Sequence, residues 1–135
     1  MADARTPVIV GPTGIGKTAV ALALSAFWPI EVVSADSRQV YRGLDIATAK
    51  PAPRERQRVP HHLIDVIRPG ERYSAGRFAV DAAEAISSIR QRGHRPVVVG
   101  GTGLYIKALV HGLFAEPPLD RPRRHQMTTV TDGMD

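Results

Sequence analysis

The segment from residue 11 to residue 18 constrains the fold more than any other part of this chain. It matches the phosphate-binding pattern G-x-x-x-x-G-K-[ST] and consists of Gly11, Pro12, Thr13, Gly14, Ile15, Gly16, Lys17 and Thr18. The apolar, β-branched residues 7–10 precede it and predict a buried strand. A helix is predicted to begin at Lys17 and to end at Pro29, with an apolar face made of Val20, Ala23, Leu24 and Phe27.

Each position of this loop has a physical role in holding a polyphosphate. Glycines let the backbone wrap closely around an anion with its N–H groups pointing inward. Lys17 supplies a positive charge to the outer phosphates, and the Thr18 hydroxyl is a ligand for Mg²⁺. The helix that follows directs its positive end at the same anion. The alternative interpretation is a glycine-rich turn without a ligand.

Further strands and helices alternate along the chain. Residues 31–34 and 96–99 predict two more buried strands. Ser74 is a favoured N-cap for a helix with Gly93 at its C-terminal end, and its apolar stripe consists of Phe78, Ala82, Ile86 and Ile89. Strands that alternate with helices predict an α/β fold, a P-loop NTPase-like parallel sheet flanked by helices on both faces.

The remaining segments are shorter or less regular. Residues 54–58 predict a short exposed helix, residues 62–66 a short extended segment, and residues 104–110 a helix that closes near Gly112. Residues 35–53 are expected to be mostly loop. Residues 121–135 show neither helical nor strand periodicity and predict a disordered tail, so we expect one domain over residues 1–120.

The composition narrows the class of protein. The chain has no cysteine, which excludes disulfides and thiolate metal sites. No apolar run approaches the length that spans a bilayer, and residues 1–6 do not resemble a signal peptide, so we expect a cytoplasmic protein without a membrane partner. The net charge is +5, mostly from arginine. Arginine favours an anionic partner, although a solvated basic surface explains the charge equally well.

Asp36 is the only well-placed carboxylate for the phosphate site. P-loop NTPases usually hold Mg²⁺ with an acid at the end of a second strand. Here the strand over residues 96–99 is followed by Gly100, Gly101 and Thr102, without an acid. Spacing leaves two roles open for Asp36, a metal ligand or a base acting on a second substrate. A third interpretation is that Asp36 caps a helix.

Several ordered motifs together resemble one enzyme family. They are the phosphate loop and the segments 36–41 (DSRQVY), 45–51 (DIATAKP), 60–65 (PHHLID), 73–75 (YSA) and 100–105 (GGTGLY). In order and spacing they resemble the tRNA dimethylallyltransferases, also called tRNA isopentenyltransferases. The resemblance covers roughly residues 7–120 and is far more specific than the phosphate loop alone.

The resemblance implies an activity and a set of site residues. The family transfers a dimethylallyl group from dimethylallyl diphosphate to N6 of the adenosine directly 3′ of the tRNA anticodon. By this resemblance, the loop residues 11–18 with Lys17 hold the diphosphate, and Thr18 binds Mg²⁺. Asp36 is the general base, and Thr102 lies near the transferred group. The segment Asp36, Ser37, Arg38 and Gln39, together with Thr102, contacts the tRNA.

Other interpretations remain open for several of these residues. Thr102 also suits a turn after a glycine pair. Tyr41 and Tyr105 are expected to pack in the core rather than stack on bases. Adjacent His61 and His62 lack acidic partners at metal-ligand spacing, so we expect them to be structural or near the substrate. Three arginines of residues 54–58 are expected to be solvated, with a tRNA phosphate contact as the alternative.

The chain also departs from the family pattern. Family members are about twice as long or longer, and the residues after 121 do not resemble them. We therefore expect a sheet that is incomplete on its C-terminal side and weak or no transferase activity. Three alternatives remain: a P-loop small-molecule kinase using ATP, a non-catalytic remnant that binds phosphate or nucleic acid, and a prenyltransferase acting on free adenylate.

Overall fold

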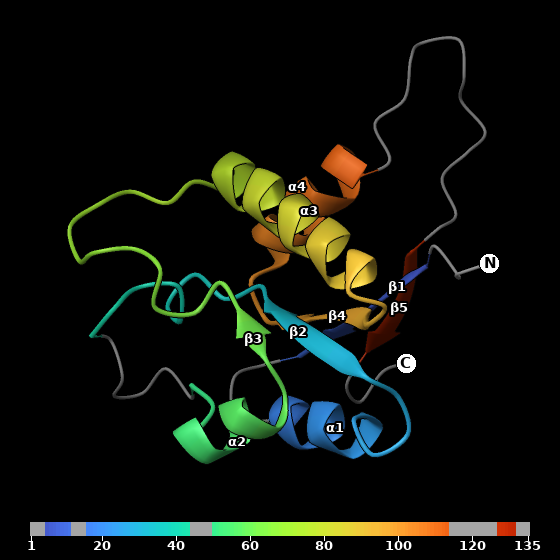
Figure 1. The fold of residues 1–135 in the computed structure, drawn as a ribbon. Helices are drawn as coiled ribbons and strands as arrows, with labels where there is room; N and C mark the ends of the chain where they lie inside the picture. Colours follow the sequence, from blue (N-terminus) through green and yellow to red (C-terminus); the bar gives the residue numbers. More distant parts are fainter. Residues whose placement is uncertain (1–4, 12–15, 44–49, 114–126, 132–135) are drawn as a thin grey trace, which may run out of the picture.

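Five parallel strands form one sheet in the order β3-β2-β4-β1-β5 (Figure 1). The computed structural model describes residues 5–11, 16–43, 50–113 and 127–131. The strands are β1 (Thr6–Val10), β2 (Ile30–Ser34), β3 (His61–His62), β4 (Arg95–Gly100) and β5 (Met127–Thr131). The predicted parallel α/β sheet is confirmed.

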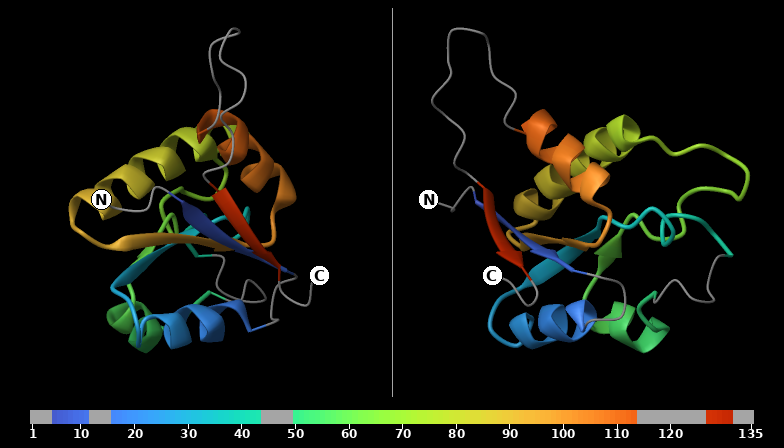
Figure 2. Two further views of the ribbon diagram at one scale, coloured as in Figure 1. Left: turned by 90° about the vertical axis from the view of Figure 1, so that its right-hand side faces the viewer. Right: turned by 180° about the vertical axis from the view of Figure 1, so that it is seen from behind.

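Helices cover both faces of the sheet. They are α1 (Lys17–Leu24), α2 (Pro53–Arg58), α3 (Ala75–Gln91) and α4 (Gly103–Leu113). Helices α1 and α2 lie on one face, and α3 and α4 lie together on the other, as all three views show (Figures 1 and 2). The chain crosses from β1 through α1 to β2, passing the position that β4 later fills between them.

Successive residues of each strand point into two separate cores. Val8, Val33 and Val98 pack with the stripe of α3, while Ile9, Val32 and Val97 pack with α1. This alternation is the period of a β-strand with both faces buried. The apolar runs predicted as strands therefore support two helical layers.

Helix α3 follows its predicted pattern closely. Its N-cap Ser74 accepts a hydrogen bond at Oγ from the Arg77 amide at 3.0 Å, and Gly93 follows its end with φ +80°. The predicted stripe is buried throughout: Phe78, Ala82, Ile86 and Ile89. A capping hydroxyl and a left-handed glycine satisfy backbone groups at helix ends, which explains these boundaries.

The predicted buried face of α1 is mostly wrong, although Leu24 is half-buried and packs against the core. Val20 is 38% exposed and Phe27 is 76% exposed, whereas Ala21 is 1% exposed against the sheet. The helix ends at Leu24, with Ser25 as its C-cap, well before Pro29. Helix α1 follows Gly16 directly, and it is the small residue Ala21 that faces the strands.

Two other segments differ in part from prediction. Only His61 and His62 pair with β2, because Leu63 and Asp65 have φ angles of +69° and +59°, which a strand does not allow. Helix α4 runs to Leu113 and passes through Gly112 rather than closing there. The short helix predicted over residues 54–58 is confirmed as α2.

The prediction of disorder after residue 121 does not hold for residues 127–131. These five residues form β5, which pairs in parallel with all of β1, from Thr6 with Met127 to Val10 with Thr131. Backbone pairing along an available strand edge orders a segment that lacks its own apolar periodicity. The rest of the predicted tail lies outside the described residues.

Candidate active site

Three loops converge beyond the carboxyl ends of β1, β2 and β4. They begin at Gly11, Ala35 and Gly101, and the crevice at this end of a parallel sheet is where such folds bind ligands. The loops touch closely. A Cβ added to Gly100 would lie 2.2 Å from the Ala35 carbonyl oxygen, and one added to Gly101 would lie 2.7 Å from that of Gly11. Glycine is required for this approach.

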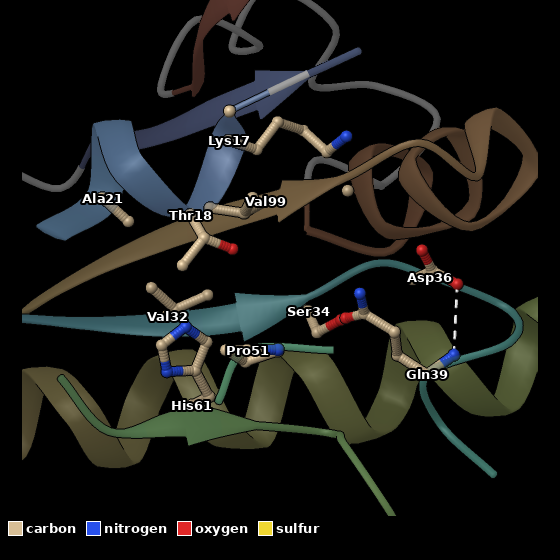
Figure 3. Close-up of a pocket in the computed structure, with 12 residues that line it drawn as sticks. Lys17, Thr18, Ala21, Val32, Ser34, Asp36, Gln39, Pro51, His61 and Val99 are labelled. Carbon is tan, nitrogen blue, oxygen red and sulfur yellow. Dashed lines mark hydrogen bonds between the residues drawn. The ribbon is translucent and has the colours of Figure 1, made fainter. Parts of the chain in front are cut away.

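A cavity of about 200 Å³ opens between these loops and α1 (Figure 3). Its lining residues are Gly16, Lys17, Thr18, Ala21, Val32, Ser34, Asp36, Gln39, Pro51, His61, Val99 and Gly100. The lining includes charged and hydroxyl groups, among them Lys17, Thr18 and Asp36, and the apolar side chains of Ala21, Val32 and Val99. The cavity thus combines groups suited to an anion with a small apolar surface.

The described ends of the phosphate loop lie between β1 and α1, as the sequence predicts. Gly16 has φ +80°, a left-handed conformation suited to glycine, and directly precedes α1. Lys17 Nζ donates a hydrogen bond to the Gly11 carbonyl at 2.9 Å, which holds the side chain across the loop. Lys17 and Thr18 both line the cavity. Pro12, Thr13, Gly14 and Ile15 lie outside the described residues.

Asp36 caps a turn and not a helix, which corrects that alternative. Its Oδ1 accepts hydrogen bonds from the amides of Arg38 at 2.8 Å and Gln39 at 3.1 Å. The side chain is only 9% exposed, and Oδ2 has no hydrogen-bond partner among the described residues. Figure 3 shows the carboxylate on the same side of the cavity as the Lys17 side chain. One oxygen fixes the orientation and the other is available to a ligand.

Thr102 lies at the junction of two loops. Its Oγ1 accepts a hydrogen bond from the Ser37 amide at 2.9 Å, and its own amide donates to the Ala35 carbonyl at 3.2 Å. Its carbonyl accepts from the Ile106 amide at 3.2 Å, the first bond of α4. Thr102 is therefore a helix-entry residue that fixes the Asp36 loop, rather than a simple turn residue.

Only part of the predicted tRNA-contacting stretch lines the cavity. Gln39 lines the cavity, and its Oε1 accepts a hydrogen bond from Ser34 Oγ at 3.0 Å. Ser37 is held to Thr102 through its amide. Arg38 is exposed at the turn, and neither Ser37 nor Arg38 lines the cavity. The structure thus brings Asp36 and Gln39 to the cavity and leaves Arg38 toward solvent.

Ser34 and Pro51 were not predicted as site residues, and for His61 a place near the substrate was one of two expectations. His61 lines the cavity, and its Nδ1 lies 2.7 Å from the Val59 carbonyl oxygen, so this nitrogen carries the proton. Burial is the main cause that lowers the pKa of His61, which favours the neutral ring. The two adjacent histidines were the available signal, but only the fold separates their roles.

The tyrosines and arginines considered in the sequence do not line the cavity. Tyr105 is 5% exposed and stacks on Phe78 at 4.6 Å between ring centroids, so it packs in the core as expected. The Tyr41 hydroxyl donates to the Glu71 carbonyl at 2.9 Å. Arg56 pairs with Asp65, whereas the Arg54 and Arg58 side chains are exposed on α2.

Metal-binding and membrane features are limited in the described part of the chain. Within residues 5–11, 16–43, 50–113 and 127–131, no group of three or more histidine, cysteine, aspartate or glutamate side chains is placed to hold a metal ion. None of the described helices has the length and apolar composition needed to cross a membrane. A cation at Thr18 and Asp36 would therefore need further oxygen ligands from a substrate or water.

The parallel sheet, the Gly16–Lys17–Thr18 helix entry and the cavity define a phosphate-binding α/β protein of the P-loop class. The sequence narrows this class further. The family model described as IPP transferase matches residues 39–133. The chain therefore belongs to the IPP transferase family. The match extends through most of the segment for which we expected no family resemblance.

Named relatives agree with this family. The chain is 56% identical over 119 residues to the tRNA dimethylallyltransferase of Halorhodospira halophila, covering 88% of this chain and 38% of the relative. It is 59% identical over 114 residues to the tRNA dimethylallyltransferase of Thermus thermophilus, covering 84% of this chain and 38% of the relative. The chain thus spans well under half the length of these relatives.

Solved structures show the same fold. A tRNA isopentenylpyrophosphate transferase from Bacillus halodurans superposes with a TM-score of 0.76 at 45% identity, covering 84% of this chain and 37% of that one. A eukaryotic dimethylallyltransferase acting on tRNA gives a TM-score of 0.73 at 35% identity, covering 87% of this chain and 30% of that one.

Proposed function

We propose that this chain carries the donor-binding and proton-accepting part of a tRNA dimethylallyltransferase site. The reaction moves a dimethylallyl group from dimethylallyl diphosphate to N6 of the adenosine 3′-adjacent to the anticodon. The observation that carries this proposal is the position of Asp36, whose Oδ2 has no partner among the described residues, in the same cavity as Lys17 and Thr18.

The donor is complementary to both the polar and the apolar residues that line the cavity. Its diphosphate is complementary to the α1 N-terminus, the Lys17 ammonium and the Thr18 hydroxyl. Its short apolar chain is complementary to Ala21, Val32 and Val99. An ordinary P-loop kinase site usually has an acid at a strand end to help hold Mg²⁺, and no acid follows β4 here.

The proposed step balances as a substitution at the allylic carbon. The bond from this carbon to the diphosphate oxygen breaks, and the electron pair leaves with the diphosphate. Positive groups at the loop stabilise that charge as it develops. The adenine N6 forms the new carbon–nitrogen bond, and its proton passes to Asp36 Oδ2. Two amide hydrogen bonds to Oδ1 keep the carboxylate oriented for this transfer.

The adenine must reach the Asp36 side of the cavity. A base stacked in the anticodon loop has to leave its stack to enter a pocket of this kind. Gln39 and Ser34 lie on that side and present amide and hydroxyl groups able to recognise a base edge. The Ser37–Thr102 hydrogen bond holds the loop that presents them. The proposed partner is thus a tRNA anticodon loop, and the proposed compartment is the cytoplasm.

Magnesium is the proposed cofactor. Oxygen ligands suit this hard cation, and the Thr18 hydroxyl would hold it together with diphosphate oxygens and water. When bound, the ion neutralises charge on the leaving diphosphate. The oxygen-rich lining of the cavity fits this ion, and the described side chains offer no histidine or cysteine cluster for a softer metal.

The test is a transfer assay with the chain, dimethylallyl diphosphate, Mg²⁺ and tRNA that lacks the modification. Prenylated adenosine in the hydrolysed tRNA, detected by mass spectrometry, supports the proposal. A tRNA with guanosine at the target position is the matched control. Transfer of the γ-phosphate from ATP to a small alcohol would instead favour a kinase. Donor binding without prenylated tRNA would favour a non-catalytic remnant, and competition by AMP would favour a free adenylate as acceptor.

A further inference from the structure

The segment over residues 63–67 lies beside the backbone that continues from the Asp36 turn. The Asp65 amide donates to the Gln39 carbonyl at 2.9 Å, and the Val66 amide donates to the Val40 carbonyl at 2.9 Å. These bonds begin at Gln39, whose own amide is bound by Asp36. The position of the turn is therefore coupled to the position of Asp65.

The Asp65 side chain also binds Lys50 and helix α2. Its Oδ1 accepts a hydrogen bond from Lys50 Nζ, and its Oδ2 accepts one from Arg56 Nη1 at 3.2 Å. Lys50 Nζ also donates to the Tyr41 carbonyl at 2.9 Å. The Asp65 carbonyl accepts from Arg42 Nε at 3.0 Å. One aspartate thus connects the segment after the turn, the residue before Pro51, and helix α2.

The backbone of Asp65 is held in an unusual conformation. Its φ of +59° lies in the left-handed region, which costs energy for residues other than glycine. Aspartate and asparagine tolerate this region better than most side chains. A conformation of this kind persists when the surrounding contacts determine it, and such positions concentrate at functional sites.

Asp65 does not line the cavity, but it contacts Gln39, which does, and Lys50, which directly precedes a lining residue. Gln39 lines the cavity, and Lys50 is followed by Pro51, which also lines it. Burial acts to raise the pKa of Asp65, but Lys50 and then Arg56 outweigh it and lower the pKa below its usual value. The charged form that makes both ion pairs is therefore the stable form.

We propose that Asp65 is a positioning residue that sets the Asp36–Gln39 turn and the Pro51 wall for the transfer reaction. The catalytic part of this inference rests on the proposed function. The structural part does not, because it concerns the order of the turn in the chain itself. The two parts can therefore be tested separately.

The first measurement is amide hydrogen exchange in the full chain carrying Asp65→Asn. Asparagine keeps the size, one acceptor oxygen and the tolerance for positive φ, but it removes the charge and replaces the second acceptor oxygen with an NH2 donor. The Arg38 and Gln39 amides should exchange about tenfold faster, which corresponds to a local loss of about 1.4 kcal/mol. The amides of Val97 and Val98 in β4 should keep their wild-type rates. Glu84→Gln, an exposed carboxylate on α3, is the matched control.

The second measurement is the steady-state rate of prenyl transfer. Asp65→Asn should lower kcat about ten- to hundredfold, because small displacements of reacting groups have effects of this size. The KM for dimethylallyl diphosphate should change less than about threefold, since Lys17 and Thr18 are not attached to Asp65. Adding Lys50→Met to Asp65→Asn should lower kcat little further, because both substitutions break the same hydrogen-bond network.

Three outcomes would overturn the inference: wild-type exchange at Arg38 and Gln39, equally faster exchange in β4, or a wild-type kcat. Equal acceleration in β4 would show a general loss of stability rather than positioning. If the wild-type chain transfers no prenyl group, the proposed function fails. In that case faster exchange confined to the turn still supports the positioning of that turn by Asp65.

Discussion

The Ser37 amide donates a hydrogen bond of 2.9 Å to Thr102 Oγ1, joining residues 65 positions apart in the sequence. Ser37 follows β2 and Thr102 follows β4, so the bond links the two loops on the Asp36 side of the cavity. Because Asp36 directly precedes Ser37, this bond holds the backbone that carries the carboxylate.

Replacing Thr102 with valine removes the acceptor while keeping the shape of the side chain. Thr102→Val should cost about 1 kcal/mol of stability, because the Ser37 amide loses its partner. It should also lower the rate of prenyl transfer at least about tenfold through displacement of Asp36. Thr102→Ser retains the hydroxyl and should stay near wild type. Equal transfer rates for the valine and serine variants would refute this role.

The close approach of Gly100 to the Ala35 carbonyl leaves no space for a side chain. Gly100→Ala should destabilise the chain by about 3 kcal/mol, as expected for severe overpacking against a backbone atom. Gly112→Ala in α4 is the matched control, since its new Cβ would make an ordinary contact of 3.8 Å with Ala79 of α3. That variant should gain up to about 1 kcal/mol from helix propensity. Thermal unfolding of both proteins decides the comparison.

Glu31 forms a polar cluster and does not line the cavity. It is 3% exposed, and its carboxylate accepts two hydrogen bonds from Arg92, at 2.6 and 3.0 Å. His62 Nε2 and His94 Nδ1 each lie 2.7 Å from its oxygens. Arg92 is the main cause that lowers the pKa of Glu31 to about 2, with burial opposing and the two histidines assisting.

This lowered pKa predicts a pH dependence of stability. A depressed folded-state pKa stabilises the protein above the unfolded value of 4.5, and the contribution is lost as pH falls from 4.5 toward about 2. Glu31→Gln should therefore cost about 2 kcal/mol near neutral pH. The difference in the free energy of unfolding between the variant and the wild type should shrink as pH falls from 4.5 toward about 2. Urea unfolding of both proteins over this range is the measurement, and a difference that stays constant would contradict it.

Lys17 is expected to increase the affinity of the chain for the diphosphate donor. Lys17→Met keeps the length of the side chain and removes its charge, so the affinity for dimethylallyl diphosphate should fall at least about tenfold. Equilibrium dialysis with labelled donor measures this directly. Lys107→Met, on the exposed surface of α4, is the matched control and should bind as wild type. An unchanged affinity in the Lys17 variant would remove the phosphate loop from the proposed site.

Much of the fold could be predicted because local patterns and the final environment agree. The cap at Ser74, the stripe of α3 and the apolar strands encode their own burial, and the structure follows them. The rotation of α1 could not be predicted, because Val20, Leu24 and Phe27 form an equally plausible stripe. Strand β5 was missed because its order comes from pairing with β1 and not from its own sequence.

The site was predictable where a residue belongs to a motif. The phosphate loop and Asp36 were found in this way, and both meet at one cavity. His61 and Pro51 belong to the motifs 60–65 and 45–51, but their place in the cavity was not predicted, because it depends on the pairing of β3 with β2 and on a long connection. Ser34 belongs to no motif and was not found. Asp65 ends the motif 60–65, but no role was predicted for it, since its contacts with Arg42, Lys50 and Arg56 appear only in the folded chain.

Asp36→Asn tests the central claim most directly. Asparagine retains an oxygen that accepts from the Arg38 and Gln39 amides, so the turn should persist, but it cannot take a proton from adenine. Single-turnover transfer to tRNA should fall at least about a hundredfold, within the range expected for loss of a general base. The dissociation constant for dimethylallyl diphosphate should change less than about threefold. Transfer by the asparagine variant at the wild-type rate would contradict the account.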